Sequence, residues 1–115
     1  MAQLILIVDD EKRFRQLYAD TLSEAGYRVA TAASAEKAME LVLKEKPAMV
    51  ISDVRMQGMD GLELLTKVRQ QSAELPFLLV TAYSSVRDAV NALKLGAVDY
   101  LEKPVDLDEL LIAVG

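Results

Sequence analysis

With 115 residues, 52% of them hydrophobic and 27% charged, the chain is large enough for one domain with a buried core and too hydrophobic for intrinsic disorder. Its 18 acidic and 13 basic residues give a net charge of -5, which argues against direct binding of nucleic acid, because such a surface needs a basic stripe. The chain has no cysteine and no histidine, which excludes disulfides, thiolate and imidazole metal sites, catalytic triads with an imidazole base, and a phosphohistidine donor.

Short apolar runs recur along the chain and predict strands. The first run, Leu4 to Val8, is too short to span a membrane and lacks the features of a signal peptide, so we expect a soluble, cytoplasmic protein without membrane contact. Similar runs predict strands at Arg28 to Ala32, Met49 to Ser52 and Phe77 to Val80, and a weaker run predicts a strand at Val98 to Leu101.

The segments between these runs carry apolar residues at helical spacing. The first predicted helix has an apolar face made of Phe14, Leu17, Tyr18, Leu22 and Ala25. Three later helices are predicted from Ala35, Ala38, Met39 and Val42, from Val86, Ala89, Val90 and Leu93, and from Leu107, Leu110, Leu111 and Val114.

Local signals mark the ends of these helices. Gly26 is placed to end the first helix in a left-handed conformation, and Ser34 is placed to cap the start of the second. Two further pairs have the spacing of capping boxes, Asp60 with Glu63 and Asp106 with Glu109.

Strands that alternate with helices imply right-handed crossovers and a five-stranded, doubly wound parallel sheet of the α/β class. Helices on both faces of such a sheet explain why Leu4 to Val8 is apolar throughout rather than alternating. We expect one domain, residues 1–115. Because the last predicted helix stops at Gly115 after about two turns, we expect that domain to be excised from a longer protein with this helix truncated.

Chemically active side chains follow four of the predicted strands. Ligands of such sheets bind at the carboxyl ends of the strands. There the sequence places the acidic run Asp9-Asp10-Glu11, then Asp53, Thr81 and the pair Lys103-Pro104. Carboxylates so close together repel one another and favour a cation, and a set of oxygen ligands favours a hard ion such as Mg²⁺.

This set of residues fits phosphoryl transfer, which needs a nucleophile, positioning and charge neutralisation. Asp53 is the candidate nucleophile, Asp9 and Asp10 the candidate metal ligands, and Lys103 and Thr81 the candidate partners of phosphoryl oxygens.

Each residue taken alone has a more ordinary explanation. Asp10 is typical of a helix N-cap, Asp53 of a turn, Thr81 of a strand and Lys103 of a solvated surface. Their placement after four different strands is what favours a site.

The stretches "ILIVDDE", "VISDVRMQGMDGLELL", "LLVTAY" and "GAVDYLEKPVDLDELL" resemble the receiver domains of bacterial two-component response regulators. The resemblance implies a flavodoxin-like fold with strand order 2-1-3-4-5. It also implies phosphorylation of Asp53 by a sensor histidine kinase. The metal ligands it implies are Asp9, Asp10 and Asp53 with the backbone carbonyl of Arg55, holding Mg²⁺.

The same resemblance assigns switch roles to Thr81 and Tyr100 and a phosphate-binding role to Lys103, and it implies a cis Lys103-Pro104 bond. A tyrosine at such a position is ordinarily a half-buried packing residue, and both roles are compatible. We expect no substrate turnover other than the domain's own phosphorylation and dephosphorylation.

The segment from Thr81 to Leu110 is most similar to receivers of nitrogen-regulator-type, sigma-54-dependent activators. This implies a transcriptional output domain beyond Gly115, because the chain has no glycine-rich phosphate loop of its own. A dimer or output face is expected on the last two helices and the last strand, around Val90, Leu93, Tyr100 and Leu107.

Three other interpretations remain open. A phosphatase of the haloacid-dehalogenase type would have a second acid two residues after Asp53, where this chain has Arg55. A flavodoxin-like FMN binder would need hydroxyls and glycines where the acidic run lies. A degenerate receiver that serves only for docking would not need the complete set. We also expect slow self-dephosphorylation, because Arg55 can obstruct the attacking water.

Overall fold

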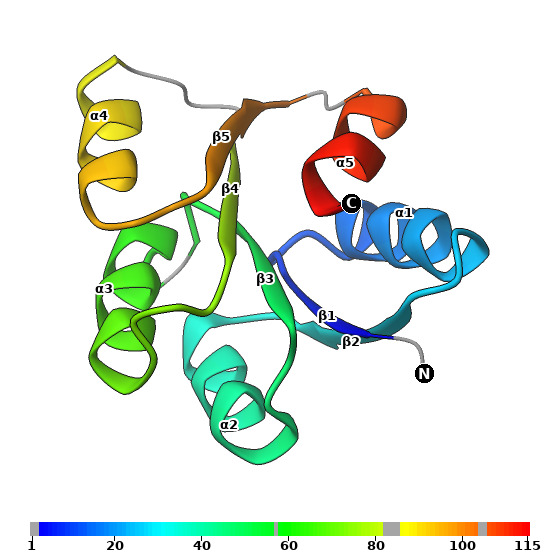
Figure 1. Cartoon of the computed structure of the whole chain (residues 1–115), viewed down its shortest axis with the longest axis horizontal. Coiled ribbons are helices and arrows are strands. Elements are labelled where there is room, and N and C mark those ends of the chain that lie inside the picture. Colours follow the sequence, from blue (N-terminus) through cyan, green and yellow to red (C-terminus); the bar gives the residue numbers. More distant parts are fainter. Residues whose placement is uncertain (1–2, 57, 82–85, 104–105) are drawn as a thin grey trace.

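The structure is a computed structural model that describes residues 3–56, 58–81, 86–103 and 106–115. Strands and helices alternate along these ranges (Figure 1). In chain order the elements are β1 (Leu4–Val8), α1 (Lys12–Glu24), β2 (Arg28–Ala32), α2 (Ala35–Glu45), β3 (Met49–Asp53), α3 (Gly61–Gln71), β4 (Phe77–Thr81), α4 (Val86–Lys94), β5 (Asp99–Glu102) and α5 (Leu107–Val114).

The strands form one parallel sheet in the order β2-β1-β3-β4-β5, which confirms the predicted fold class and strand order. β3 and β4 are each one residue longer than predicted. Asp53 pairs with Val80, and Thr81 pairs with Glu102, so both polar residues continue the ladder of hydrogen bonds. β5 begins at Asp99 rather than Val98, one residue later than the apolar run indicates.

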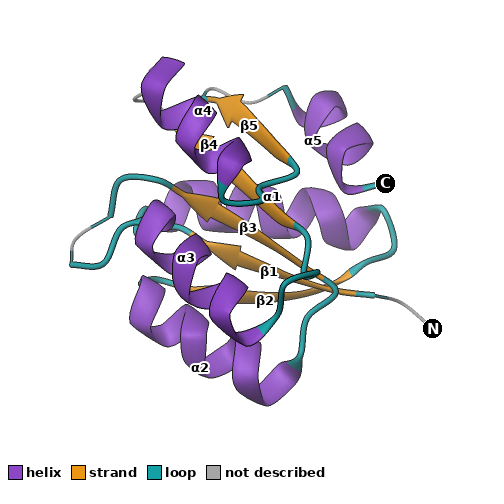
Figure 2. Ribbon diagram, turned by 60° about the vertical axis from the view of Figure 1, so that its left-hand side comes forward, coloured by secondary structure: helices purple, strands orange, loops and turns teal. Residues whose placement is uncertain are grey.

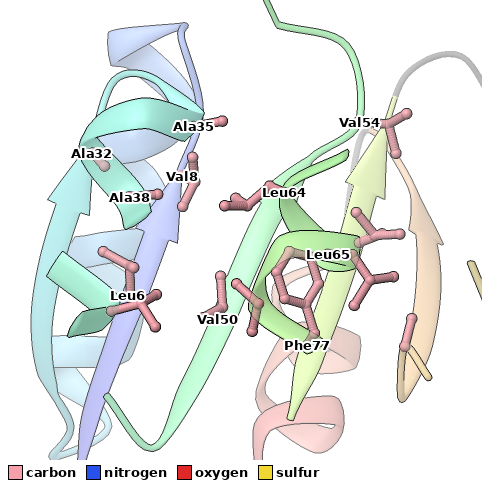
Figure 3. Packing of buried hydrophobic residues seen from close by; sticks show 14 of the residues in the cluster. Leu6, Val8, Ala32, Ala35, Ala38, Val50, Val54, Leu64, Leu65 and Phe77 are labelled. Carbon is pink, nitrogen blue, oxygen red and sulfur yellow. The ribbon is translucent and has the colours of Figure 1, made fainter. Parts of the chain in front are cut away.

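The sheet separates two layers of helices. α1 and α5 cover one face, and α2, α3 and α4 cover the other (Figures 1 and 2). Because successive side chains of a strand point to opposite faces, β1 contributes Ile5 and Ile7 to one core cluster and Leu6 and Val8 to the other. Figure 3 shows the second of these clusters, in which Leu64 and Phe77 pack with Val50. The domain thus has a core on each side of β1, β3 and β4.

The predicted signals at the helix ends are largely confirmed. Gly26 has a φ of 98° just beyond α1, and the hydroxyl of Ser34 accepts from the Lys37 backbone N–H at 3.2 Å. The carboxylate of Asp60 caps α3 by accepting from the Glu63 N–H at 2.9 Å. Asp106 accepts from Asp108, one residue nearer than the capping-box spacing predicts, and the residue at the cap position of α1 is Glu11 rather than Asp10. Among the described residues, no helix has the length and apolar character needed to cross a membrane.

Arg69 joins the ends of two helices on the side of the sheet that α3 and α4 cover. Its guanidinium donates to the carbonyl oxygens of Ser72 at 3.2 Å and Leu75 at 2.7 Å in the loop after α3. It also donates to the carbonyl of Gly96 at 2.7 Å, just beyond α4. Burial lowers the pKa of Arg69 from its ordinary value, but the group stays protonated, since arginine loses its proton only at very high pH. One side chain therefore holds three backbone acceptors at the ends of α3 and α4.

We expect Arg69→Met to lower the free energy of unfolding by about 2 kcal/mol, because methionine keeps the apolar contacts and removes three charge-assisted hydrogen bonds. Urea denaturation followed by circular dichroism measures the change. Lys67→Met, at an exposed position of the same helix, is the control and should change stability by less than about 0.5 kcal/mol. Equal losses in the two variants would contradict this role of Arg69.

Candidate functional site

The carboxyl ends of the parallel strands bring the predicted site residues to one edge of the sheet. Asp9 follows β1, Asp53 ends β3 and Thr81 ends β4, while Lys103 follows β5. Figure 2 shows the strands running in the same direction, so their carboxyl ends lie at the same edge. The topology therefore joins residues that lie up to 94 positions apart in the sequence.

The ammonium of Lys103 lies between two buried carboxylates. Its Nζ is 2.9 Å from Oδ2 of Asp9 and 3.0 Å from Oδ2 of Asp53. The exposed fractions of the three side chains are 5%, 2% and 7% for Lys103, Asp9 and Asp53. Charged groups buried to this degree need partners, because the loss of hydration costs several kcal/mol per ion. Two acids and one base leave the group with an excess negative charge when all three are ionised.

Burial and pairing act in opposite directions on these groups. Burial lowers the pKa of the Lys103 ammonium, but hydrogen bonds and charges from Asp9 and Asp53 outweigh it and leave that pKa raised. Burial raises the pKa of the Asp53 carboxyl, and the hydrogen bond from Lys103 only partly offsets the increase. Lys103 therefore stays protonated. The partners of ionised Asp53 do not fully compensate for the hydration that it loses on burial.

Backbone hydrogen bonds fix the orientation of both carboxylates. Oδ1 of Asp9 accepts from the Glu11 N–H at 2.9 Å, and Oδ1 of Asp53 accepts from the Arg55 N–H at 3.3 Å. A hydrogen bond from the Ser52 hydroxyl to the Asp53 carbonyl, at 2.8 Å, further restrains the peptide that carries the candidate nucleophile. Each acid thus has one oxygen held by the loop and the other held by Lys103.

The residues fit a hard cation. Asp9, Asp10 and Asp53 each offer a carboxylate oxygen, and these atoms lie within 4.8 Å of one another. Asp9 and Asp53 are buried, while Asp10 is exposed and leaves the cluster open to solvent. A small divalent ion with oxygen ligands would keep several waters, and an exposed side provides room for them. The backbone N–H of Arg55 contacts Asp53, whereas the role of its carbonyl as a ligand stays a prediction.

The two predicted switch residues lie on adjacent strands. Thr81 is fully buried, and its carbonyl accepts from the Lys103 N–H at 2.7 Å. Tyr100 is half-buried on β5, pairs with Leu79 and packs against the core cluster on the α2, α3 and α4 side. The predicted cis bond between Lys103 and Pro104 lies outside the described residues.

Gly61 was not predicted as a site residue, yet it sets the position of Asp53. A Cβ at residue 61 would collide with the Asp53 carbonyl oxygen and would lie 3.0 Å from Cα of Val54. The N–H of Gly61 also donates to the Val54 carbonyl at 2.8 Å. A glycine directly after the capping Asp60 could have indicated this contact, since glycine allows two backbones to approach closely. α3 therefore begins in direct contact with the strand that carries Asp53.

Phe14 is a second residue that the sequence pattern did not indicate as part of the site. Its helical spacing predicts a core position, and it does pack against the core cluster beneath α1 and α5. Its ring also lies under the ammonium of Lys103, with Nζ 4.1 Å from the ring centroid. Helical spacing alone cannot show that a core residue also contacts the site, because the ammonium of Lys103 comes from the other end of the chain.

The raised pKa of Asp53 predicts how stability depends on pH in the metal-free protein. A proton on Asp53 favours the folded state, so this contribution is present below the ordinary carboxyl pKa and is lost as pH rises through the folded value. We expect Asp53→Asn to be more stable than the wild type near pH 7, with the difference shrinking as the pH falls toward the ordinary carboxyl range. Urea denaturation in a chelating buffer measures it.

The exposed Asp20→Asn is the matched control and should show no such trend. Adding Mg²⁺ should stabilise the wild type more than Asp53→Asn, because an ion that binds the folded state adds to its stability. A wild type more stable than Asp53→Asn near pH 7 without metal would contradict the prediction.

Comparison with known proteins gives a consistent result. Residues 5–115 match the response regulator receiver domain family. The C4-dicarboxylate transport transcriptional regulatory protein DctD of Pseudomonas aeruginosa is 43% identical over 110 residues, which are 96% of this chain and 24% of that protein. The DNA-binding transcriptional regulator NtrC of Escherichia coli is 37% identical over 111 residues, again 96% of this chain and 24% of that protein. The chain spans about a quarter of the length of these curated relatives.

Solved structures agree with the sequence comparison. The chemotaxis protein CheY4 of Vibrio cholerae superimposes with a TM-score of 0.94 at 34% identity, covering 99% of this chain and 97% of that one. NtrX of Brucella abortus superimposes with a TM-score of 0.92 at 37% identity, covering 99% of this chain and 26% of that one. The likeness extends over almost the whole sheet and its helices.

Proposed function

This chain belongs to the response regulator receiver domain family, and from that premise we propose that it is a phosphorylation switch in which Asp53 accepts a phosphoryl group from a sensor histidine kinase. The observation that carries the proposal is the ammonium of Lys103 held 3.0 Å from Oδ2 of Asp53 within a buried acidic cluster. A carboxylate nucleophile, a fixed cation and a site for a divalent ion are the parts that this reaction needs.

In the proposed reaction an oxygen of the Asp53 carboxylate attacks phosphorus, the bond between phosphorus and the donor nitrogen breaks, and an acyl phosphate forms. Oδ1 of Asp53 is held by the Arg55 N–H, so Oδ2, which contacts Lys103, is the oxygen placed for attack. The Lys103 ammonium then pairs with a phosphoryl oxygen. Asp9, Asp10 and Asp53, with the Arg55 carbonyl, would hold Mg²⁺, which supplies charge neutralisation of the phosphoryl group.

The switch would pass from Asp53 to the outer strand through Thr81 and Tyr100. Support comes from their placement: Thr81 ends β4 beside the site, and Tyr100 lies on β5 two residues before Glu102, the partner of Thr81 in the ladder. A hydroxyl that moves toward a phosphoryl oxygen would leave space near β5, and an amphipathic ring has both buried and exposed arrangements of similar energy. We expect no turnover beyond the domain's own phosphorylation and dephosphorylation.

We further propose that the chain is one domain of a longer protein, with a transcriptional output domain after Gly115, of the kind found in sigma-54-dependent activators. Support comes from the transcriptional regulators to which it is similar and from the quarter of their length that it spans. The surface of α4, β5 and α5 is the proposed contact with the output domain or with a second copy. Val90 and Leu93 are exposed there, while Tyr100 and Leu107 are half-buried.

The other interpretations have less support. The described acidic cluster contains no second acid two residues after Asp53, as a haloacid-dehalogenase-type phosphatase would have, because that position is Arg55. The same cluster would repel the phosphate of FMN. A domain used only for docking would have no need to bury Asp9, Asp53 and Lys103 together at the cost of their hydration.

We predict that the chain gains the mass of one phosphoryl group when incubated with Mg²⁺ and acetyl phosphate, and that Asp53→Asn abolishes the gain. Intact-protein mass spectrometry measures both. Asp20→Asn, at an exposed position, is the matched control and should be phosphorylated like the wild type. An unchanged mass gain in Asp53→Asn would show that the phosphoryl group is carried elsewhere.

We also predict that Arg55→Ala shortens the lifetime of the phosphorylated form by several-fold, because the exposed Arg55 follows Asp53 at a distance of two residues and can obstruct the attacking water. The decay of the phosphorylated mass after removal of acetyl phosphate gives the lifetime. Arg87→Ala, an exposed arginine on α4, is the control. Identical decay in the wild type and Arg55→Ala would sink this explanation.

A further inference from the structure

The ammonium of Lys103 has a third neighbour besides the two carboxylates. Its Nζ lies 4.1 Å from the centroid of the Phe14 ring, inside the range in which a cation is attracted by the face of an aromatic ring. An ammonium has three N–H bonds, and two of them are used by Asp9 and Asp53. The ring is therefore the third side of a cage around the cation.

The ring itself is held in place by α1. Phe14 stacks on Tyr18 with centroids 6.0 Å apart and ring planes 27° apart. Tyr18 is only 2% exposed, and burial raises its pKa to about 12, so it is a fixed and neutral neighbour. Phe14 also packs against the core cluster that includes Leu110 of α5. Neighbours on α1 and in the core cluster therefore support the ring beside the cation.

We propose that Phe14 is a positioning residue for Lys103, which confines the ammonium to the side of the site where the phosphoryl group is received. Lysine has a flexible four-carbon stem, and the backbone N–H of Lys103 donates to the Thr81 carbonyl at 2.7 Å, which fixes the start of the side chain but not its ammonium. Asp9 is one of the acids that would hold a metal ion, and in that role it would no longer pair with the ammonium. The ring then keeps the cation beside Asp53, where its freed N–H can reach a phosphoryl oxygen.

This inference rests on the proposed function, since it concerns how Lys103 meets the phosphoryl group. A second cation lies near the same ring: the guanidinium carbon of Arg13 is 5.1 Å from the Phe14 centroid. The Arg13 side chain is 81% exposed and pairs with Glu11 at 3.8 Å, so its attraction to the ring is weakened by water. Arg13 provides the control that separates a buried cation from an exposed one.

The test measures binding of beryllofluoride, a mimic of the phosphoryl group, to the 115-residue chain in saturating Mg²⁺ by calorimetry. Phe14→Leu keeps the apolar packing and removes the ring, and we expect it to weaken beryllofluoride binding by roughly 3- to 30-fold. Binding of Mg²⁺ alone should stay within about twofold of wild type, because the variant keeps the three carboxylates that would hold the ion. Arg13→Gln should leave both affinities unchanged.

A second series of variants separates the electrostatic effect of the ring from its packing. Mono-, di- and trifluorinated phenylalanine at position 14 have nearly the same shape, but each fluorine withdraws electron density from the ring face and weakens its attraction for a cation. Beryllofluoride affinity should fall stepwise along the series, while the urea midpoint stays constant. A flat series, or a loss of Mg²⁺ affinity in parallel with that of beryllofluoride, would overturn the positioning role. Failure of the wild type itself to bind beryllofluoride would instead count against the proposed function.

Discussion

The charge balance at Lys103 is the constraint on which the rest of the site depends. Two aspartates can be buried at the ends of β1 and β3 only because an ammonium lies 2.9 and 3.0 Å from them. Even with this cation the cluster of three acids keeps an excess negative charge, which makes it complementary to a metal ion, and only with such an ion bound would it accept an anionic phosphoryl group. Lys103 therefore compensates the buried carboxylates in the metal-free site, and in the proposed function a bound metal ion would take over part of that role.

This charge balance also explains the architecture around it. A parallel sheet is the simplest way to bring the ends of distant segments to one edge, and both layers of helices are needed to exclude water from it. The site is contacted from both layers: Phe14 of α1 lies beneath the Lys103 ammonium, and Gly61 brings α3 against the backbone of Asp53. The hydrophobic cores thus support the polar site directly rather than lying at a distance from it.

The spacing of apolar residues and the signals at the helix ends were sufficient to predict the sheet, the helices and the edge at which the candidate site lies. They were less accurate at the last residue of a strand, because Asp53 and Thr81 are polar and end the apolar run while their backbones continue the ladder. That Phe14 belongs to the core and also contacts the site could not be predicted, since only the tertiary structure brings the ammonium of Lys103 over its ring. The role of Gly61 could not be predicted either, because the capping residue Asp60 already accounts for the start of the helix.

The close approach at Gly61 determines where a modified Asp53 can find room. The first turn of α3 lies against the peptides of Asp53 and Val54 without space for even a methyl group, and a 2.8 Å hydrogen bond joins the two segments. β3 and α3 consequently form one rigid wall of the site. A phosphoryl group on Asp53, as proposed, would therefore have to lie away from this wall, on the side of Thr81 and Lys103.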